Sequence, residues 1–123
     1  MKKTSIHVYG IRNCDTVKKA RQWLDDHGQP HQFHDFKTAG VTAQLLDHWM
    51  AQIGWEALLN RKGTTWRQLD ETARASAADA PGARAVMVAS PSVIKRPVVA
   101  WGEPGSTDIS VGFNAELWES RRV

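Results

Sequence analysis

Cys14 is the only cysteine in this chain of 123 residues, and it stands between a short apolar stretch and a predicted helix. A thiol at a helix N-terminus faces unpaired backbone N–H groups and the positive end of the helix dipole. Both stabilise the thiolate, which is the nucleophilic form of cysteine. A free cysteine is also often a buried core residue, but the polar neighbours Asn13 and Asp15 favour the reactive interpretation. Cys14 is therefore the first candidate for covalent chemistry.

The chain has no second thiol that could resolve a species formed on Cys14. A two-cysteine redox motif would read Cys-x-x-Cys, whereas this segment reads Cys14-Asp15-Thr16-Val17. An outside thiol must then attack a mixed disulfide on Cys14, and glutathione is the obvious small cytosolic candidate. A single cysteine also excludes an intramolecular disulfide and is typical of a reducing compartment.

Two arginines could assist such a thiol. Arg61 lies in a predicted loop between helical segments, and Arg96 directly precedes a predicted strand. A guanidinium group binds carboxylates and oxyanions with two hydrogen bonds, and its charge lowers the pKa of a nearby thiol. Most arginines are simply exposed to solvent, so the residues alone leave both interpretations open.

Three histidines, His27, His31 and His34, are close enough in sequence to suggest a metal site. His27 falls at the end of a predicted helix, whereas His31 and His34 fall on opposite faces of one predicted strand. Ligands in such positions do not converge on one ion. We therefore predict that the protein has no metal site.

The composition excludes several other classes. The net charge is +3 and the isoelectric point about 9.3, and the basic residues form no long block, so no direct nucleic-acid binding is expected. No segment is long and apolar enough to span a bilayer, and the first residues lack the apolar core of a signal peptide. We expect a cytoplasmic protein that has no membrane partner.

Periodicity and turn signals predict a strand, a helix and a second strand at residues 5–10, 15–27 and 31–36. An all-helical segment follows at about residues 42–90. Its first helix is predicted to start at the N-cap Thr42, Thr65 with Gln68 has the form of a capping box, and Pro81 with Gly82 is expected to break a helix.

Two strands at residues 98–101 and 107–111 are predicted to form a hairpin before a last helix. Asn114 is its expected N-cap, and Phe113 and Trp118 occupy the positions of a hydrophobic staple. A β-α-β unit favours two parallel strands, and the final β-β-α adds antiparallel ones. We therefore predict a single α/β domain, residues 1–123, with a thioredoxin/glutaredoxin-like fold and an all-helical insertion between its β-α-β and β-β-α parts.

Three separated segments resemble the arsenate reductase (ArsC)/Spx family, most closely its YffB-type branch. They span residues 9–20, 59–66 and 92–98, and a fourth match, Val111-Gly112-Phe113-Asn114, lies near the end. The resemblance implies a thioredoxin-like fold, a nucleophilic Cys14 and an anion-binding Arg96. It further implies that Arg61 is a second active-site arginine and that Pro97 is a cis-proline beside the thiol, so we expect Asn13, Arg61, Arg96 and Pro97 to bind glutathione or another anion.

The chain departs from the family pattern at one position. Glutaredoxin-coupled arsenate reductases of this family carry a third arginine after the last hairpin, where this chain reads Ser110-Val111-Gly112-Phe113-Asn114. The main prediction is therefore a glutathione-dependent thiol reductase acting through Cys14, with glutathione as cosubstrate and glutaredoxin as a further partner. The alternatives are an arsenate (oxyanion) reductase coupled to glutathione and glutaredoxin, and a non-catalytic Spx-type regulator that binds the RNA polymerase α subunit.

Overall fold

The computed structural model describes residues 6–102 and 106–120. The chain divides into two compact units, one made of residues 1–35 with 96–123 and the other of residues 36–95. The first unit contains the sheet and the second contains helices, so the helical segment starts a few residues before the predicted boundary at 42.

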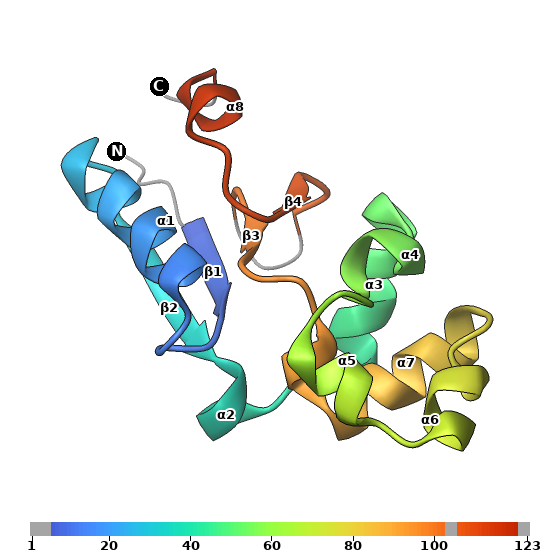
Figure 1. Ribbon diagram of the computed structural model, residues 1–123. Helices are drawn as coiled ribbons and strands as arrows, with labels where there is room; N and C mark the ends of the chain where they lie inside the picture. The colour runs from blue at the N-terminus through green and yellow to red at the C-terminus, as the bar shows by residue number, and fades with distance from the viewer. Residues whose placement is uncertain (1–5, 103–105, 121–123) are drawn as a thin grey trace. The chain divides into compact units, whose positions relative to one another are not determined.

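The sheet of the first unit has the strand order β2-β1-β3-β4 (Figure 1). Its strands are β1 (Ile6–Gly10), β2 (His31–Asp35), β3 (Val98–Ala100) and β4 (Ile109–Val111), and its helices are α1 (Asp15–Asp26) and α8 (Ala115–Glu119). β1 pairs with β2 in parallel, while β3 pairs antiparallel with both β1 and β4. The predicted parallel β-α-β unit and the predicted final hairpin are both confirmed.

One face of this sheet forms the core of the first unit. Val8 lies opposite Phe33 on β2 and opposite Val99 on β3. Because side chains alternate between the two faces of a strand, such residues share one face. The buried cluster is completed from the helices and consists of Ile6, Val8, Ala20, Leu24, Val99 and Trp118.

Trp118 joins α8 to this core. Its ring meets those of Trp23, Trp101 and Phe113 edge to face, at centroid distances of 5.5, 4.8 and 4.8 Å. Asn114 caps α8 by accepting a hydrogen bond from the Leu117 N–H. The predicted cap and the predicted contact between Phe113 and Trp118 are both confirmed.

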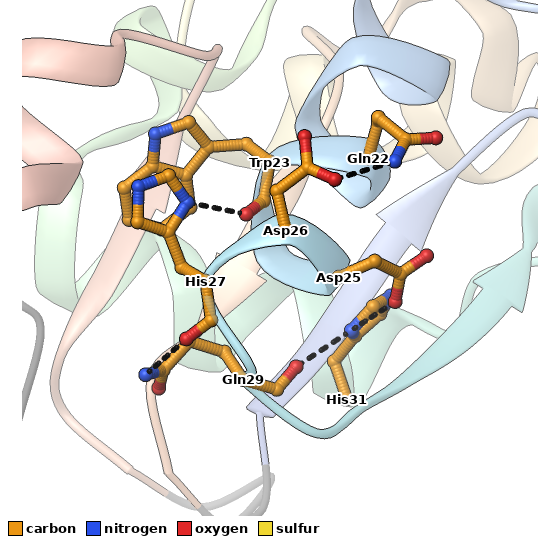
Figure 2. Close-up of polar contacts among 7 residues, drawn as sticks. All are labelled: Gln22, Trp23, Asp25, Asp26, His27, Gln29 and His31. Carbon is orange, nitrogen blue, oxygen red and sulfur yellow. Dashed lines mark hydrogen bonds and ion pairs between the residues drawn. The ribbon is translucent and has the colours of Figure 1, made fainter.

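The C-terminal end of α1 carries a group of polar contacts (Figure 2). Asp25 and Asp26 lie near the negative end of the helix dipole, an unfavourable place for carboxylates. Gln22 donates to Asp26 at 2.8 Å, and a His31 ring nitrogen lies 4.0 Å from Asp25. His27 follows the helix as its C-cap, and its Nε2 lies 3.1 Å from a carboxylate oxygen of Glu119. This ion pair is a second link between α1 and α8.

The second unit holds only helices, apart from one bridge between Leu59 and Ile94, within the described residues. They are α2 (Phe36–Ala39), α3 (Ala43–Ile53), α4 (Trp55–Leu58), α5 (Thr64–Gln68), α6 (Glu71–Ser76), α7 (Ala80–Ala89) and a 3-10 turn, η1 (Pro91–Val93). Its fully buried side chains include Leu46, Trp49, Leu58, Met87 and Ile94. Thr42 caps α3 by accepting from the Leu45 N–H, as predicted.

Three local predictions were wrong. The second strand ends at Asp35, because Phe36 starts α2 and its buried ring lies 6.3 Å from that of Trp49. Thr65 forms no capping box, since it lies inside α5 and Gly63 is the N-cap.

Pro81 and its neighbour Gly82 do not break a helix either, but lie in the first turn of α7. A proline needs no hydrogen-bond partner in that turn, and Asp79 caps the helix by accepting from the Gly82 N–H at 2.9 Å.

Within the described ranges, no helix has the length and apolar character needed to cross a bilayer.

Replacing Trp118 should destabilise the first unit more than replacing its neighbour. Trp118 is 3% exposed and contacts three aromatic rings, so Trp118→Ala should lower the free energy of unfolding by about 3–5 kcal/mol. Leu117, which is 65% exposed, is the matched control, and Leu117→Ala should change stability by no more than about 0.5 kcal/mol. Urea unfolding measures both, and equal losses would contradict the packing described.

Candidate active site

Cys14 is placed by the turn that connects β1 to α1. Its backbone N–H donates to the Ile11 carbonyl at 3.1 Å, and its own carbonyl accepts from the Lys18 N–H at 2.9 Å. Cys14 is thus the N-cap of α1, with extended backbone angles φ −97° and ψ 125°. This is the position predicted for it, at the end of the helix where N–H groups lack partners.

The surroundings of Cys14 favour the thiolate. Partial burial raises the pKa of the Cys14 thiol, but hydrogen bonds from the Val17 N–H, the Arg96 guanidinium and the Thr16 N–H lower it. The positive charge of Arg96 lowers it further, and the balance leaves the pKa below its ordinary value. Hydrogen bonds and positive charge stabilise the ionised form of an acid, whereas burial destabilises it. At a given pH below the ordinary pKa, more of Cys14 is therefore thiolate, which is the nucleophilic form of cysteine.

Arg96 and Pro97 connect this site to β3. Arg96 is half-buried and interacts with the Cys14 sulfur. Its role in binding an anion stays a prediction. The peptide bond between Arg96 and Pro97 is cis, so that prediction is confirmed. The Pro97 carbonyl accepts from the Gly112 N–H at 2.9 Å. Asn13 lies next to the thiol in the chain and is exposed in the turn.

Arg61 lies in the other unit, on the exposed loop that follows α4. Its guanidinium carbon is 5.4 Å from the centre of the Trp55 ring, a cation–π distance. The loop is held by Asn60, whose N–H donates to the Val93 carbonyl at 2.8 Å and whose side chain accepts from the Lys62 N–H at 3.1 Å. A role for Arg61 at the thiol stays a prediction.

A cluster of titratable rings on the sheet was not predicted from the sequence. His7 Nδ1 and His34 Nε2 are 2.8 Å apart, and the Tyr9 ring stacks on that of His34 at 4.5 Å. Burial and the neighbouring His7 lower the pKa of His34, and burial raises the pKa of Tyr9. The parallel register that places Tyr9 opposite His34 brings these rings together. No three His, Cys, Asp or Glu side chains among the described residues are arranged to hold a metal ion.

The sheet combines parallel and antiparallel strands, α1 begins at Cys14, and Arg96 lies just before β3. This arrangement is a thioredoxin-like fold. The ArsC family model matches residues 9–120, which is nearly the whole chain. The chain therefore belongs to the ArsC family, and the resemblance noted in the sequence is confirmed.

Individual relatives support this assignment. An uncharacterized protein of Haemophilus influenzae is 41% identical over 115 residues, which cover 94% of this chain and 96% of that protein. A solved structure named YFFB protein is 42% identical, covers 96% of this chain and 99% of its own, and superposes with a TM-score of 0.87. The solution structure of an arsenate reductase (ArsC) related protein from Brucella melitensis is 45% identical. It covers 98% of this chain and 96% of its own, and superposes with a TM-score of 0.74.

Removing the Arg96 side chain should make the thiol less acidic. Arg96→Ala removes both a hydrogen bond to the sulfur and a positive charge, so the pKa of Cys14 should rise. For each unit by which the pKa rises, the variant has about one-tenth as much Cys14 thiolate as the wild type at any pH below the wild-type pKa. Lys19→Ala is the matched control, because it removes an exposed positive charge from α1. Thiolate absorbance followed against pH measures both variants, and equal shifts would contradict a specific role for Arg96.

His34 should make stability depend on pH. Its pKa is lowered in the folded chain, so the unfolded chain binds a proton first as the pH falls below the ordinary value of about 6.5. The free energy of unfolding should therefore keep its full value above this pH and fall as the pH drops towards the pKa of His34 in the folded chain. His34→Gln should reduce this loss in urea unfolding, whereas His48→Gln, on α3, should retain it. Identical pH profiles for wild type and His34→Gln would show that His34 is not responsible.

Proposed function

We propose that this protein is a glutathione-dependent thiol reductase that acts through Cys14. The observation that carries the proposal is the placement of Cys14 at the N-terminus of α1, where the Val17 and Thr16 N–H groups and Arg96 lower the pKa of its thiol. An activated thiolate in a chain that has no second cysteine suits a reaction in which a small outside thiol completes the cycle. The membership of the ArsC family supports thiol-based reduction as the class of reaction.

The reaction has two exchange steps. The Cys14 thiolate attacks the glutathione sulfur of a mixed disulfide, so that a bond forms between Cys14 and glutathione and the substrate leaves as a thiolate. A second glutathione, as thiolate, then attacks the glutathione sulfur bound to Cys14. This forms oxidised glutathione and releases the Cys14 thiolate. One free glutathione is thus oxidised and the substrate sulfur is reduced to a thiolate, while the glutathione sulfur of the mixed disulfide passes into oxidised glutathione.

Arg96 has a second role in this proposal, as a binding group for an anion beside the thiol. A guanidinium can share its N–H groups between the thiolate and a carboxylate, and glutathione carries two carboxylates. Asn13 is exposed in the turn before Cys14 and offers an amide to the same ligand. Arg61 is proposed as a second cationic group for the same anion, as the family resemblance implies.

Reduction of an oxyanion is the second candidate. A relative that is 45% identical carries the description arsenate reductase (ArsC) related protein. The Cys14 thiolate would attack the arsenic of arsenate and form a sulfur–arsenic bond as one arsenate oxygen leaves as water. One glutathione would then attack the Cys14 sulfur and release arsenite, and a second would free Cys14 as oxidised glutathione forms. However, the segment Ser110–Asn114 contains no arginine, so fewer positive groups would face the charge that develops on the oxyanion. Arsenate should therefore be a poorer substrate than a glutathione mixed disulfide.

The test is turnover of a glutathione–cysteine mixed disulfide with glutathione, coupled to the reduction of oxidised glutathione. Cys14→Ser should abolish turnover. Arg96→Ala should weaken glutathione binding by about 1.5–3 kcal/mol, which corresponds to roughly ten- to a hundredfold in affinity. Lys19→Ala should behave as wild type.

Arsenate replaces the disulfide in a parallel assay, and arsenate turnover that exceeds disulfide turnover would favour the second candidate. Absence of turnover with both substrates would refute the reductase proposal.

A further inference from the structure

The first turn of α1 approaches the end of β1 very closely, at the contact between Gly10 and Val17. A Cβ atom placed on Gly10 would lie 2.7 Å from Cγ2 of Val17 and 3.6 Å from its Cγ1. Side-chain atoms do not approach this closely, so either the helix or the Val17 side chain would have to move. The backbone angle of Gly10 is not in the left-handed region, so glycine is required here for space alone.

Val17 cannot easily turn away from such an added atom. Its side chain is fully buried, and a β-branched residue in a helix strongly prefers one rotamer. Ala20 and Leu24 extend the same buried stripe along α1. Relief of the contact would therefore require the first turn of α1 to shift relative to β1.

The same residue also acts on the thiol. Cys14 is the N-cap of α1 and Val17 is the third residue of this helix, so its N–H belongs to the first turn, whose N–H groups have no partner within the helix. This N–H is among the groups that lower the pKa of Cys14. The side chain of Val17 thus fixes the helix against the strand, while its backbone N–H stabilises the thiolate. A displacement of this turn would move the N–H away from the sulfur.

We propose that Gly10 and Val17 are positioning residues for Cys14. Gly10 leaves space for Val17 to pack against the end of β1, and this packing holds the Val17 N–H at the Cys14 sulfur. The proposal deepens the reductase function proposed above, because it names the contact on which the reactivity of that thiol depends. Neither residue touches the substrate.

A double-mutant cycle tests the proposal. Gly10→Ala should raise the pKa of Cys14 and slow its alkylation by iodoacetamide below neutral pH. Val17→Ala keeps the N–H and should leave the pKa near the wild-type value, although it loses buried side-chain volume and stability. In the variant that carries both changes, the added Cβ would meet the Cβ of residue 17 at 3.7 Å, an ordinary contact. Its thiol pKa and alkylation rate should therefore return to wild-type values.

Stability is measured in the same variants by urea unfolding. The double variant should recover the thiol pKa without recovering the stability lost in Val17→Ala, which separates positioning from a purely structural role. Gly102→Ala is the matched control, because an added Cβ there would lie 3.4 Å from its nearest neighbour, Ser106. This control should retain the wild-type pKa.

Two outcomes would overturn the proposal. One is a folded Gly10→Ala protein with an unchanged thiol pKa, and the other is a double variant whose pKa remains raised. If Gly10→Ala alone does not fold, the double variant decides the question. These measurements need no substrate. If the variants show the expected thiol pKa values but the wild-type protein shows no turnover, the reductase function is refuted and the positioning role of Gly10 and Val17 still holds.

Discussion

The site depends on how closely the first turn of α1 packs against the end of β1. Burial of an aliphatic side chain such as that of Val17 stabilises a fold by about 1.5–3 kcal/mol, and Val17, Ala20 and Leu24 lie along one stripe of this helix. This packing fixes the direction of the N–H groups at the start of α1. Those N–H groups lower the pKa of Cys14 only if they face its sulfur. One row of buried residues therefore determines both the placement of the helix and the acidity of the thiol.

Features that depend on neighbouring residues could be predicted from the sequence. The caps at Thr42 and Asn114 and the start of α1 at Cys14 each follow from a few adjacent residues. Pro81 shows where the same reasoning fails, because a proline can end a helix or start one. The choice depends here on Asp79, which caps α7.

Contacts that depend on the exact register between distant segments could not be predicted. The contact between His7 and His34 follows from the parallel register of β1 and β2. The sequence of either strand alone does not specify this register. Cys14 was predicted from its local surroundings, whereas the residues alone left the role of Arg96 open and the family resemblance implied that it binds an anion. Its contact with the sulfur joins residues 82 positions apart, so only the folded structure could establish it.

A lowered pKa has opposing consequences for a thiol that must work alone. In the first proposed step Cys14 is the nucleophile, and a lower pKa gives more thiolate but makes each thiolate less nucleophilic. In the second step Cys14 is the leaving group, and a thiolate of low pKa leaves faster. A two-cysteine site can divide these roles between two sulfurs, but this chain has one sulfur for both. The Val17 N–H and Arg96 stabilise the same thiolate in both steps, as it is consumed and as it is released, so the environment that activates Cys14 also favours its regeneration.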